Sequence, residues 1–295
     1  MSWWKKLKGK ISFNERLNKH TTFKIGGPCG YFIEPEDIDD LKLALSLLKK
    51  YHVPFLVIGA GSNVLVSDRG LIGAVLHLTA PSFTKLTFKG NIAETGAGCP
   101  LQKLISEAAK RALSGYELLS GIPGTVGGAL VMNAGSGKNQ RNFGDLVEKV
   151  TIMDYNSNIK VLTGKQLKFS YRKSNLSGCI ILSARIKFNK GNKKEAAGKI
   201  REYLSYRKNS QDSAHPSAGC IFKNPVGFSA GKLIDSCGLK GSSIGRASIS
   251  LKHANFIINR GKASSGDVMK LIALAKRKVK NKFNIDLKPE IQIWR

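Results

Sequence analysis

The sequence has few acidic residues: 20 Asp and Glu stand against 48 Lys and Arg, which gives a formal net charge of +28. A field of that sign attracts nucleic acids, anionic lipids and anionic small molecules. The basic residues are spread over the whole chain, and helix-turn-helix, zinc-finger and RNP aromatic signatures are all absent. We therefore interpret the net charge as the result of solvated surface lysines. A basic nucleic-acid-binding protein is the alternative interpretation, from another functional class.

Cysteine is scarce, and long apolar runs are missing. The cysteines are odd in number and form no C-x-x-C pair; they are Cys29, Cys99, Cys179, Cys220 and Cys237. This pattern argues against a disulfide framework or a zinc site and fits a reducing cytoplasm. No apolar stretch approaches the ~20 residues that span a bilayer, and the N-terminus lacks the apolar core of a secretory signal. The sequence thus predicts a cytoplasmic protein without a metal site.

Two common nucleotide-binding fingerprints are also missing, because the chain has neither G-x-G-x-x-G nor a complete Walker A loop. It has instead a glycine-rich run over residues 120–137 and a shorter turn over 59–63, which follows the apolar residues 55–58. Glycine tolerates positive φ and close ligand approach, and successive backbone N–H groups can cradle a pyrophosphate. Two such loops favour a dinucleotide ligand, although tight turns alone explain either loop equally well.

At 295 residues and 42% hydrophobic content, the chain is long enough for two or three lobes with real cores. Apolar spacing predicts helices over residues 37–51, 100–113, 195–208, 229–237 and from Ser264 or Ser265 to 279. A β-α-β pattern over 31–58 precedes a β-rich segment, and the polar stretch 190–194 suggests a domain boundary. Residues 1–14 are predicted to form a loosely ordered basic tail. The alternative is that Trp3 and Trp4 rest on an anionic membrane surface.

Seven short motifs, in their order and spacing, carry a family resemblance. They cover residues 20–28, 59–63, 120–135, 171–174 (Tyr-Arg-Lys-Ser), 217–225 (Ser-Ala-Gly-Cys-Ile-Phe-Lys-Asn-Pro), 253–256 (His-Ala-Asn-Phe) and 289–290 (Pro-Glu). The set resembles the UDP-N-acetylenolpyruvoylglucosamine reductase family, FAD enzymes that complete UDP-N-acetylmuramic acid for peptidoglycan. The resemblance spans about residues 13–295. The compact C-terminal part looks like the shorter subtype, which lacks an extra substrate-capping loop.

The resemblance implies an α+β fold. A two-lobed FAD-binding unit of the vanillyl-alcohol-oxidase (PCMH) type would cover residues 15–190, with lobes of about 15–80 and 81–190. A smaller α/β substrate-binding domain over 195–295 would return its last strand to the active site. FAD and NADPH are the implied cofactors, and a monomer is expected. The FAD-contacting positions would be Ile58, Gly59, Ala60, Gly61, Ser62, Asn63, Ser120, Gly121, Ile122, Pro123, Gly124, Gly127, Gly128, Asn133, Ala134 and Gly135.

The resemblance also assigns the catalytic groups. Arg172 and Glu290 match the residues that bind and polarise the enolpyruvyl group, although from the residues alone a surface arginine and a strand-edge charge are the simpler interpretation. Tyr171 and Lys223 are expected to contact substrate, and Asn224 to shape the pocket. The guanidinium of Arg172 suits the binding of the enolpyruvyl group, because it stays charged and can hold an oxyanion through two parallel hydrogen bonds.

Cys220 occupies the position of the family's general acid, which is usually serine. A thiol titrates near about 8.5 when unperturbed, so it is a usable proton donor at neutral pH. From composition alone, the simpler interpretation of Cys220 is a small, buried side chain that behaves as an apolar residue. Two further readings stay open: a flavin oxidase of the same fold with another substrate, and a folded paralogue that has lost catalysis, which the exchange of serine for cysteine motivates.

Overall fold

The computed structural model describes residues 3–135 and 141–295, and the chain forms two compact units. The first unit comprises Met1–Phe13, Tyr31–Ala60 and Gly73–Ser205. The second comprises Asn14–Gly30, Gly61–Ile72 and Tyr206–Arg295. The chain therefore passes from one unit to the other several times. The sequence indicated only continuous domains, and those domain boundaries remain a prediction.

The N-terminal segment of the first unit is packed, and the expectation of a loosely ordered tail was wrong for its described residues. Trp3–Lys6 form a short 3-10 helix, and strand β1 (Lys10–Arg16) follows. Trp3 is only 6% exposed and stacks on Tyr51, with ring centroids 5.9 Å apart. Trp4 packs edge-on against Phe13 at 5.3 Å. Both indole rings are thus used for packing inside the unit.

The predicted β-α-β pattern is present. Helix α1 (Ile38–Lys50) begins at Asp37, whose carboxylate accepts a hydrogen bond from Asp40 N at 2.8 Å, as a good N-cap does. The helix buries Leu41, Ala44, Leu45 and Leu48, the face that the i, i+3, i+4, i+7 spacing predicted. Strand β3 (Phe55–Ile58) pairs in parallel with β5 (Leu71–His77) in a sheet of order β1-β2-β5-β3, where β2 is Pro28–Glu34.

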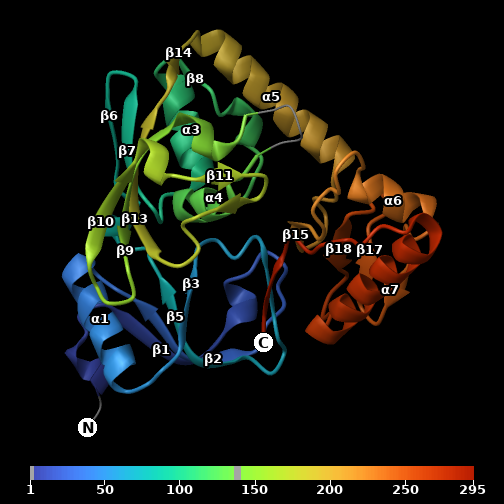
Figure 1. The fold of residues 1–295 in the computed structure, drawn as a ribbon, viewed down its shortest axis with the longest axis horizontal. Helices are drawn as coiled ribbons and strands as arrows, with labels where there is room; N and C mark the ends of the chain where they lie inside the picture. The colour runs from blue at the N-terminus through green and yellow to red at the C-terminus, as the bar shows by residue number, and fades with distance from the viewer. Residues whose placement is uncertain (1–2, 136–140) are drawn as a thin grey trace. The chain divides into compact units, whose positions relative to one another are not determined.

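A five-stranded antiparallel sheet of order β10-β9-β13-β7-β6 forms the larger core of the first unit. Its strands are β6 (Leu86–Lys89), β7 (Ile92–Gly96), β9 (Val147–Met153), β10 (Ile159–Thr163) and β13 (Ile180–Lys187). Helices α3 (Leu101–Lys110) and α4 (Val126–Met132) lie along one face of this sheet (Figure 1). This packing places the glycine-rich run, which contains α4, directly against β7 and β13.

Short elements complete the first unit. They are α2 (Pro81–Thr84), β8 (Leu113–Ser114) paired with β14 (Asn189–Lys190), and the hairpin strands β11 (Phe169–Ser170) and β12 (Lys173–Ser174). Helix α5 (Lys193–Ser210) contains the division between the units and buries only Ala196.

The second unit is built on a sheet of order β15-β18-β17-β16, covered by helices α6 (Ala230–Ser236) and α7 (Ser265–Phe283). Its strands are β15 (Ser217–Cys220), β16 (Ser243–Ile244), β17 (Ala247–Ile249) and β18 (Phe256–Asn259). A separate parallel pair joins β4 (Val64–Val66) to β19 (Gln292–Trp294). One apolar core unites these elements, because Phe23 and Leu65 pack in the same cluster as Ile221 and Leu271.

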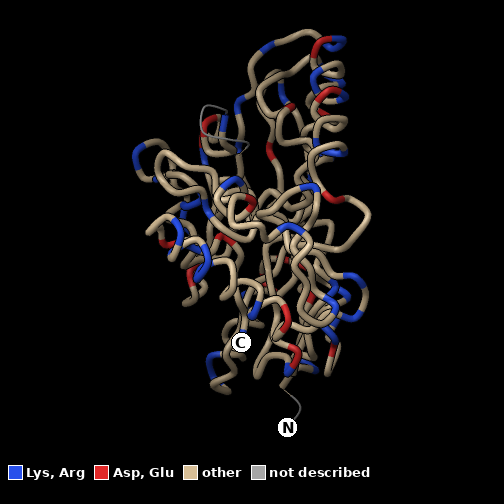
Figure 2. The backbone as a smooth tube through the Cα atoms, turned by 90° about the vertical axis from the view of Figure 1, so that its right-hand side faces the viewer, with Lys and Arg blue, Asp and Glu red and all other residues tan. Residues whose placement is uncertain are grey.

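Charge is dispersed through both units. Figure 2 shows lysine and arginine positions distributed along the chain, with acidic positions scattered among them. Among the described residues, no helix is both long and apolar enough to cross a membrane.

The start of α7 makes a pH-dependent contribution to stability. Ser264 Oγ accepts from Asp267 N at 3.0 Å, and Asp267 Oδ2 accepts from Ser264 N at 3.0 Å. The backbone hydrogen bond from Ser264 is the main cause that holds the pKa of Asp267 below its ordinary 3.8. Because a depressed folded-state pKa stabilises only above the unfolded pKa, this contribution is present at neutral pH and is lost as the pH falls through the lower, folded value.

Asp267→Asn should therefore lower the free energy of unfolding by about 0.5 kcal/mol at neutral pH, the usual size of the contribution of an exposed carboxylate in the first turn of a helix. The difference between the variant and the parent protein should vanish below the folded pKa of Asp267. Urea unfolding at a series of pH values measures this. A difference that persists unchanged into strong acid would contradict the assignment.

Candidate functional site

The described part of the glycine-rich run, residues 120–135, uses its glycines in two ways. Val126 N donates to Cys99 O at 2.9 Å and Gly127 N to Ala97 O at 2.8 Å, which fixes the start of α4 against residues 97–99. A Cβ on Gly127 would come within 3.1 Å of the Ala97 Cβ. Gly127 is therefore explained by close packing alone. Ser136 and Gly137, the end of the predicted run, lie outside the described residues.

Other N–H groups of the run remain available. Within residues 3–135 and 141–295, the backbone N–H groups of Gly121, Gly124 and Thr125 have no hydrogen-bond acceptor. The same holds, across this described part of the chain, for the N–H groups of Ala60 and Ser62 in the first glycine turn. Such donors are what an anionic group needs from a cradle of backbone amides.

The first glycine turn begins beside the start of α4. A Cβ built on Gly59 would lie 2.5 Å from Thr125 Oγ1, the atom that caps α4 by accepting from Gly128 N at 3.3 Å. In the second unit, Gly61 has φ +60°, and a Cβ there would collide with the carbonyl oxygen of His20. Both positions thus require glycine, Gly59 for space and Gly61 for backbone conformation as well.

The residues fit a polar cofactor with a pyrophosphate. Ser120 is 7% exposed, and its Oγ has no hydrogen-bond partner among the described residues. A buried hydroxyl without a partner is costly, so it marks a position where a bound molecule supplies the partner. Together with the backbone N–H groups of Ala60, Gly121, Gly124 and Thr125 in the same unit, this donor set fits a dinucleotide such as FAD.

Arg172 is brought to the end of the glycine-rich run by the β11–β12 hairpin. Its backbone is left-handed, with φ +53°. Nη2 donates to Gly135 O at 2.6 Å, and the guanidinium lies 5.2 Å from the centroid of the Tyr171 ring. The hairpin is tied to α4 because Ser174 Oγ donates to Val131 O at 2.9 Å. The predicted residues Arg172, Tyr171 and Gly135 therefore form one cluster.

Asn133 holds this cluster together. It caps the C-terminus of α4 in a left-handed conformation and is 3% exposed. Its Nδ2 donates to Ser170 O at 2.9 Å, and its Oδ1 accepts from Gly144 N at 2.9 Å. Both ends of the carboxamide are used, so Asn133 orients the hairpin that carries Arg172. The sequence had assigned it only to cofactor contact.

Cys220 and Glu290 lie close together in the second unit, although 70 positions separate them in the sequence. Glu290 N donates to Ile221 O at 2.8 Å, and Lys223 N donates to Lys288 O at 2.9 Å. Cys220 ends β15 after a register shift that begins at Ser217, and Gly219 has φ +73°. A bulge of this kind re-aims a side chain. Cys220 is half-buried.

The same backbone network includes the predicted cofactor turn. Asn63 Nδ2 donates to Glu290 O at 3.2 Å, and Gln292 N donates to Asn63 O at 2.9 Å. The structure thus joins Asn63, Glu290 and Ile221, the residue after Cys220, inside one unit. This connection is the strongest geometric support for a single site built from distant sequence motifs.

Two positioning residues within the recognised motifs were not predicted as site residues. Asn255 Nδ2 donates to Phe222 O at 2.8 Å and its Oδ1 accepts from Phe222 N at 2.9 Å, so it fixes the backbone two residues after Cys220. Thr22 Oγ1 donates to Ser217 O at 2.8 Å, and Thr22 N donates to Gly61 O at 3.1 Å. A carboxamide or hydroxyl that bonds only backbone leaves no spacing signal, which is why the sequence alone does not find these roles.

The comparisons with known proteins decide the family. Residues 211–294 match the model of the UDP-N-acetylenolpyruvoylglucosamine reductase C-terminal domain, and residues 29–163 match an FAD binding domain. The UDP-N-acetylenolpyruvoylglucosamine reductase of Caldanaerobacter subterraneus subsp. tengcongensis is 43% identical over 97% of this chain and 94% of the relative. The enzyme of that name from Bacillus subtilis is 39% identical over the same shares.

The chain belongs to the UDP-N-acetylenolpyruvoylglucosamine reductase family. The crystal structure of the family member from Thermus caldophilus superposes with a TM-score of 0.82 and 36% identity, covering 98% of this chain and 100% of that one. The predicted α+β fold with an FAD-binding unit is confirmed, as is FAD as cofactor. The nucleic-acid-binding alternative is not supported.

The remaining predicted residues of this reductase-family chain lie around Cys220. Asn224 Oδ1 accepts from Ala230 N at 2.9 Å, so this side chain helps to begin α6. Lys223 is tied by its backbone to Lys288. His253 is half-buried, and burial lowers its pKa below the ordinary 6.5, which keeps the imidazole neutral near pH 7. Substrate contact by Lys223 and Asn224 stays a prediction.

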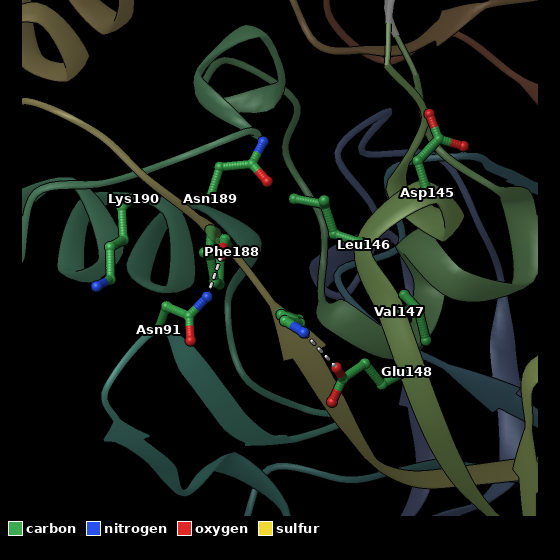
Figure 3. Close-up of a pocket in the computed structure, with 9 residues that line it drawn as sticks. Asn91, Asp145, Leu146, Val147, Glu148, Phe188, Asn189 and Lys190 are labelled. Atoms are coloured by element: carbon green, nitrogen blue, oxygen red, sulfur yellow. Dashed lines mark hydrogen bonds and ion pairs between the residues drawn. The ribbon is translucent and has the colours of Figure 1, made fainter.

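A pocket of about 430 Å³ in the first unit is not this site. Figure 3 shows its lining, which includes Asn91, Asp145, Glu148 and Phe188. Its polar groups pair with one another, because Asn91 Nδ2 donates to Phe188 O at 2.7 Å and Glu148 lies 3.9 Å from Lys187 Nζ. None of the predicted site residues lines it.

The space at Gly59 provides a test of FAD binding by this family member. Gly59→Val should displace the Thr125 side chain and fill the cradle, and should weaken FAD binding by at least about tenfold. Flavin content after reconstitution measures this. Gly178→Val is the matched control, because no atom lies within 4 Å of a Cβ built there. Full flavin loading of the Gly59 variant would remove this turn from the cofactor site.

Proposed function

We propose that this chain reduces UDP-N-acetylglucosamine enolpyruvate to UDP-N-acetylmuramate, with NADPH as reductant and FAD as the resident cofactor. Family membership supports the reaction. The observation that carries it for this chain is the backbone network that joins Asn63, Glu290 and Ile221, the residue after Cys220. That network supports the proposal, because it connects the backbone next to Cys220 and the backbone of Glu290 to Asn63 of the predicted cofactor turn.

The reduction adds a hydride and a proton across the carbon–carbon double bond of the enolpyruvyl group. FAD, when bound, would supply the hydride chemistry by accepting a hydride from NADPH and passing it to the terminal vinyl carbon. Negative charge then develops on the neighbouring carbon and its carboxylate. Preorganised charge aimed at such a centre lowers the barrier more than it stabilises the ground state.

The protein side chains would supply the rest. The Arg172 guanidinium, held by Gly135 O and the hairpin turn, would bind the enolpyruvyl carboxylate. Glu290 would assist in polarising the same group. The Cys220 thiol would donate its proton to the carbon next to the carboxylate and be left as a thiolate, which regains a proton from solvent before the next turnover. Tyr171 and Lys223 would contact the substrate.

The partner and location assignments follow from this reaction. Both substrates are anionic small molecules, which a +28 chain attracts over long range. A monomer in the cytoplasm, where nucleotide precursors are made, is the expected state. A weak membrane contact by residues 1–14 would have to use the lysines there, because Trp3 is buried in the first unit.

Mass analysis of the nucleotide product after turnover in D₂O tests the proposed reaction. NADPH-dependent conversion should add two hydrogen atoms across the double bond. The carbon that Cys220 protonates should carry deuterium from solvent, and the terminal carbon should also take up deuterium, because the N–H of reduced FAD exchanges with solvent. An unchanged nucleotide together with oxygen-dependent NADPH oxidation would indicate a flavin oxidase of the same fold. Salt-sensitive nucleic-acid binding by a preparation that cannot take up flavin would overturn the enzyme assignment altogether.

A further inference from the structure

A second cavity, of about 270 Å³, lies within the second unit. Its lining consists of Arg16, Asn18, residues 24–27, Asp68 and residues 262–264. In the sheet register Cys220 pairs with Phe256, at the first residue of β18, whereas the cavity-lining residues 262–264 follow the last residue, Asn259. The cavity is therefore at the opposite end of β18 from Cys220. None of the residues proposed above for catalysis or cofactor binding lines it.

The cavity walls are held by buried hydrogen bonds. Asn259 is 3% exposed, and its Nδ2 donates to Phe23 O at 3.0 Å. Its Oδ1 accepts from Gly261 N at 2.9 Å and from Ala263 N at 3.0 Å. On another side, Gly27 N donates to Ser67 O at 2.8 Å. One buried carboxamide thus fixes the segments that carry Lys24 and Lys262, so the cavity is preformed.

Three cationic side chains line the cavity: Arg16, Lys24 and Lys262. Both lysines have left-handed backbones, with φ +55° at Lys24 and φ +60° at Lys262. This conformation is unfavourable for a residue with a Cβ and a long side chain, and such outliers concentrate at functional sites. The Lys24 ammonium makes a long contact of 3.5 Å with Lys19 O.

One carboxylate, Asp68, also lines the cavity, but it is already engaged. Asp68 Oδ2 accepts from Ser265 N and from Ser265 Oγ, both at 2.7 Å. It therefore caps the start of α7, and the cavity keeps a net positive charge from the three cations. A cation would be repelled by this lining, whereas an oxyanion would be attracted.

Asn18 adds a second requirement. Its Oδ1 is buried and has no hydrogen-bond partner in the part of the chain that the structure describes. An oxygen acceptor can be satisfied only by a donor, so the occupant must offer an O–H or N–H group as well as negative charge. Hydrogenphosphate combines both properties in one ion, and a phosphorylated polyol combines them in one molecule.

We propose that this cavity binds a phosphate group that is accompanied by a hydroxyl donor, with Arg16, Lys24 and Lys262 contacting the phosphate oxygens and Asn18 Oδ1 accepting the hydroxyl hydrogen. The site is separate from the proposed active site and does not rest on the proposed reaction. Inorganic phosphate and a sugar phosphate are the two sources of this chemistry.

Calorimetric titration of the FAD-loaded protein at low ionic strength tests the proposal, with inorganic phosphate, ribose 5-phosphate and sulfate as probes. Phosphate should bind with a stoichiometry of one, and sulfate, which has no proton at neutral pH, should bind more weakly. Tighter binding of ribose 5-phosphate than of phosphate would show that the sugar occupies the rest of the cavity, and would identify a sugar phosphate as the ligand. Equal binding would assign the site to the inorganic ion.

The double variant Lys24→Gln/Lys262→Gln should weaken phosphate binding by about tenfold or more, because it removes two charge-assisted contacts. Lys276→Gln/Lys278→Gln is the matched control, since it makes the same charge change at exposed positions of α7. The control should bind phosphate like the parent protein, and both variants should keep their flavin. Equal weakening by both variants, sulfate binding as tight as phosphate binding, or no binding by the parent protein would each overturn the proposal.

Discussion

Cys220→Ala is expected to lower kcat by about 10² to 10⁴-fold while the protein keeps its FAD, because a positioned general acid contributes an effect of that size. The methyl group of alanine cannot donate a proton. Protonation of the substrate carbon would then depend on water. Steady-state turnover with NADPH and the enolpyruvyl nucleotide measures the loss.

Cys220→Ser is the informative companion variant, because it restores the family's usual donor with a smaller atom. It should retain activity within about tenfold of the parent protein. Cys237→Ala is the control for removing a half-buried thiol from the same unit. Near-normal turnover by Cys220→Ala would remove Cys220 from the mechanism, and equal losses in both alanine variants would show a general effect on the fold.

Arg172→Ala is expected to lower kcat by about 10² to 10³-fold, the effect of removing one preorganised group that stabilises developing negative charge. The loss should fall on the half-reaction with the enolpyruvyl nucleotide, whereas flavin reduction by NADPH should change less. Rapid-mixing measurements that follow the flavin in each half-reaction separately distinguish the two.

Arg172 also donates to Gly135 O, so its removal affects the cluster at the end of α4 as well as the substrate. Arg172→Lys keeps the charge but loses the two-pronged geometry, and should recover only part of the activity. Lys173→Ala is the neighbouring control, since Lys173 is exposed and was assigned no role. Equal losses in both half-reactions would assign Arg172 to holding the hairpin and would take it out of the chemistry.

Local structure could be predicted from the sequence where it depends only on residues within one helix or strand. The buried faces of α1 and α7 follow from apolar spacing, and Asp37 and Ser264 begin these helices as their side chains predict. The helix predicted over 100–113 is shorter, Leu101–Lys110, because Ala112 adopts a left-handed backbone with φ +55°. In these cases the physical cause lies within a few residues of its effect.

Long-range pairing could not be predicted in this way. Nothing in the local sequence indicates that Glu290 N bonds to Ile221 O, or that Asn63 lies beside Glu290. Trp3 looks like part of a basic tail because its packing partners, Tyr31 and Tyr51, are distant in the chain. Only the family resemblance connected Cys220 and Glu290 beforehand, and the structure supplies the hydrogen bond between Glu290 N and Ile221 O that joins their segments.

One polypeptide is proposed to carry both half-reactions on a bound flavin. An anaerobic visible spectrum of the purified protein, recorded after NADPH and again after the enolpyruvyl nucleotide, tests it most directly. We expect NADPH to bleach the flavin band and the nucleotide to restore it. A band that bleaches but does not return would contradict the proposed substrate or the role of Cys220, and a protein that takes up no FAD would contradict the cofactor site itself.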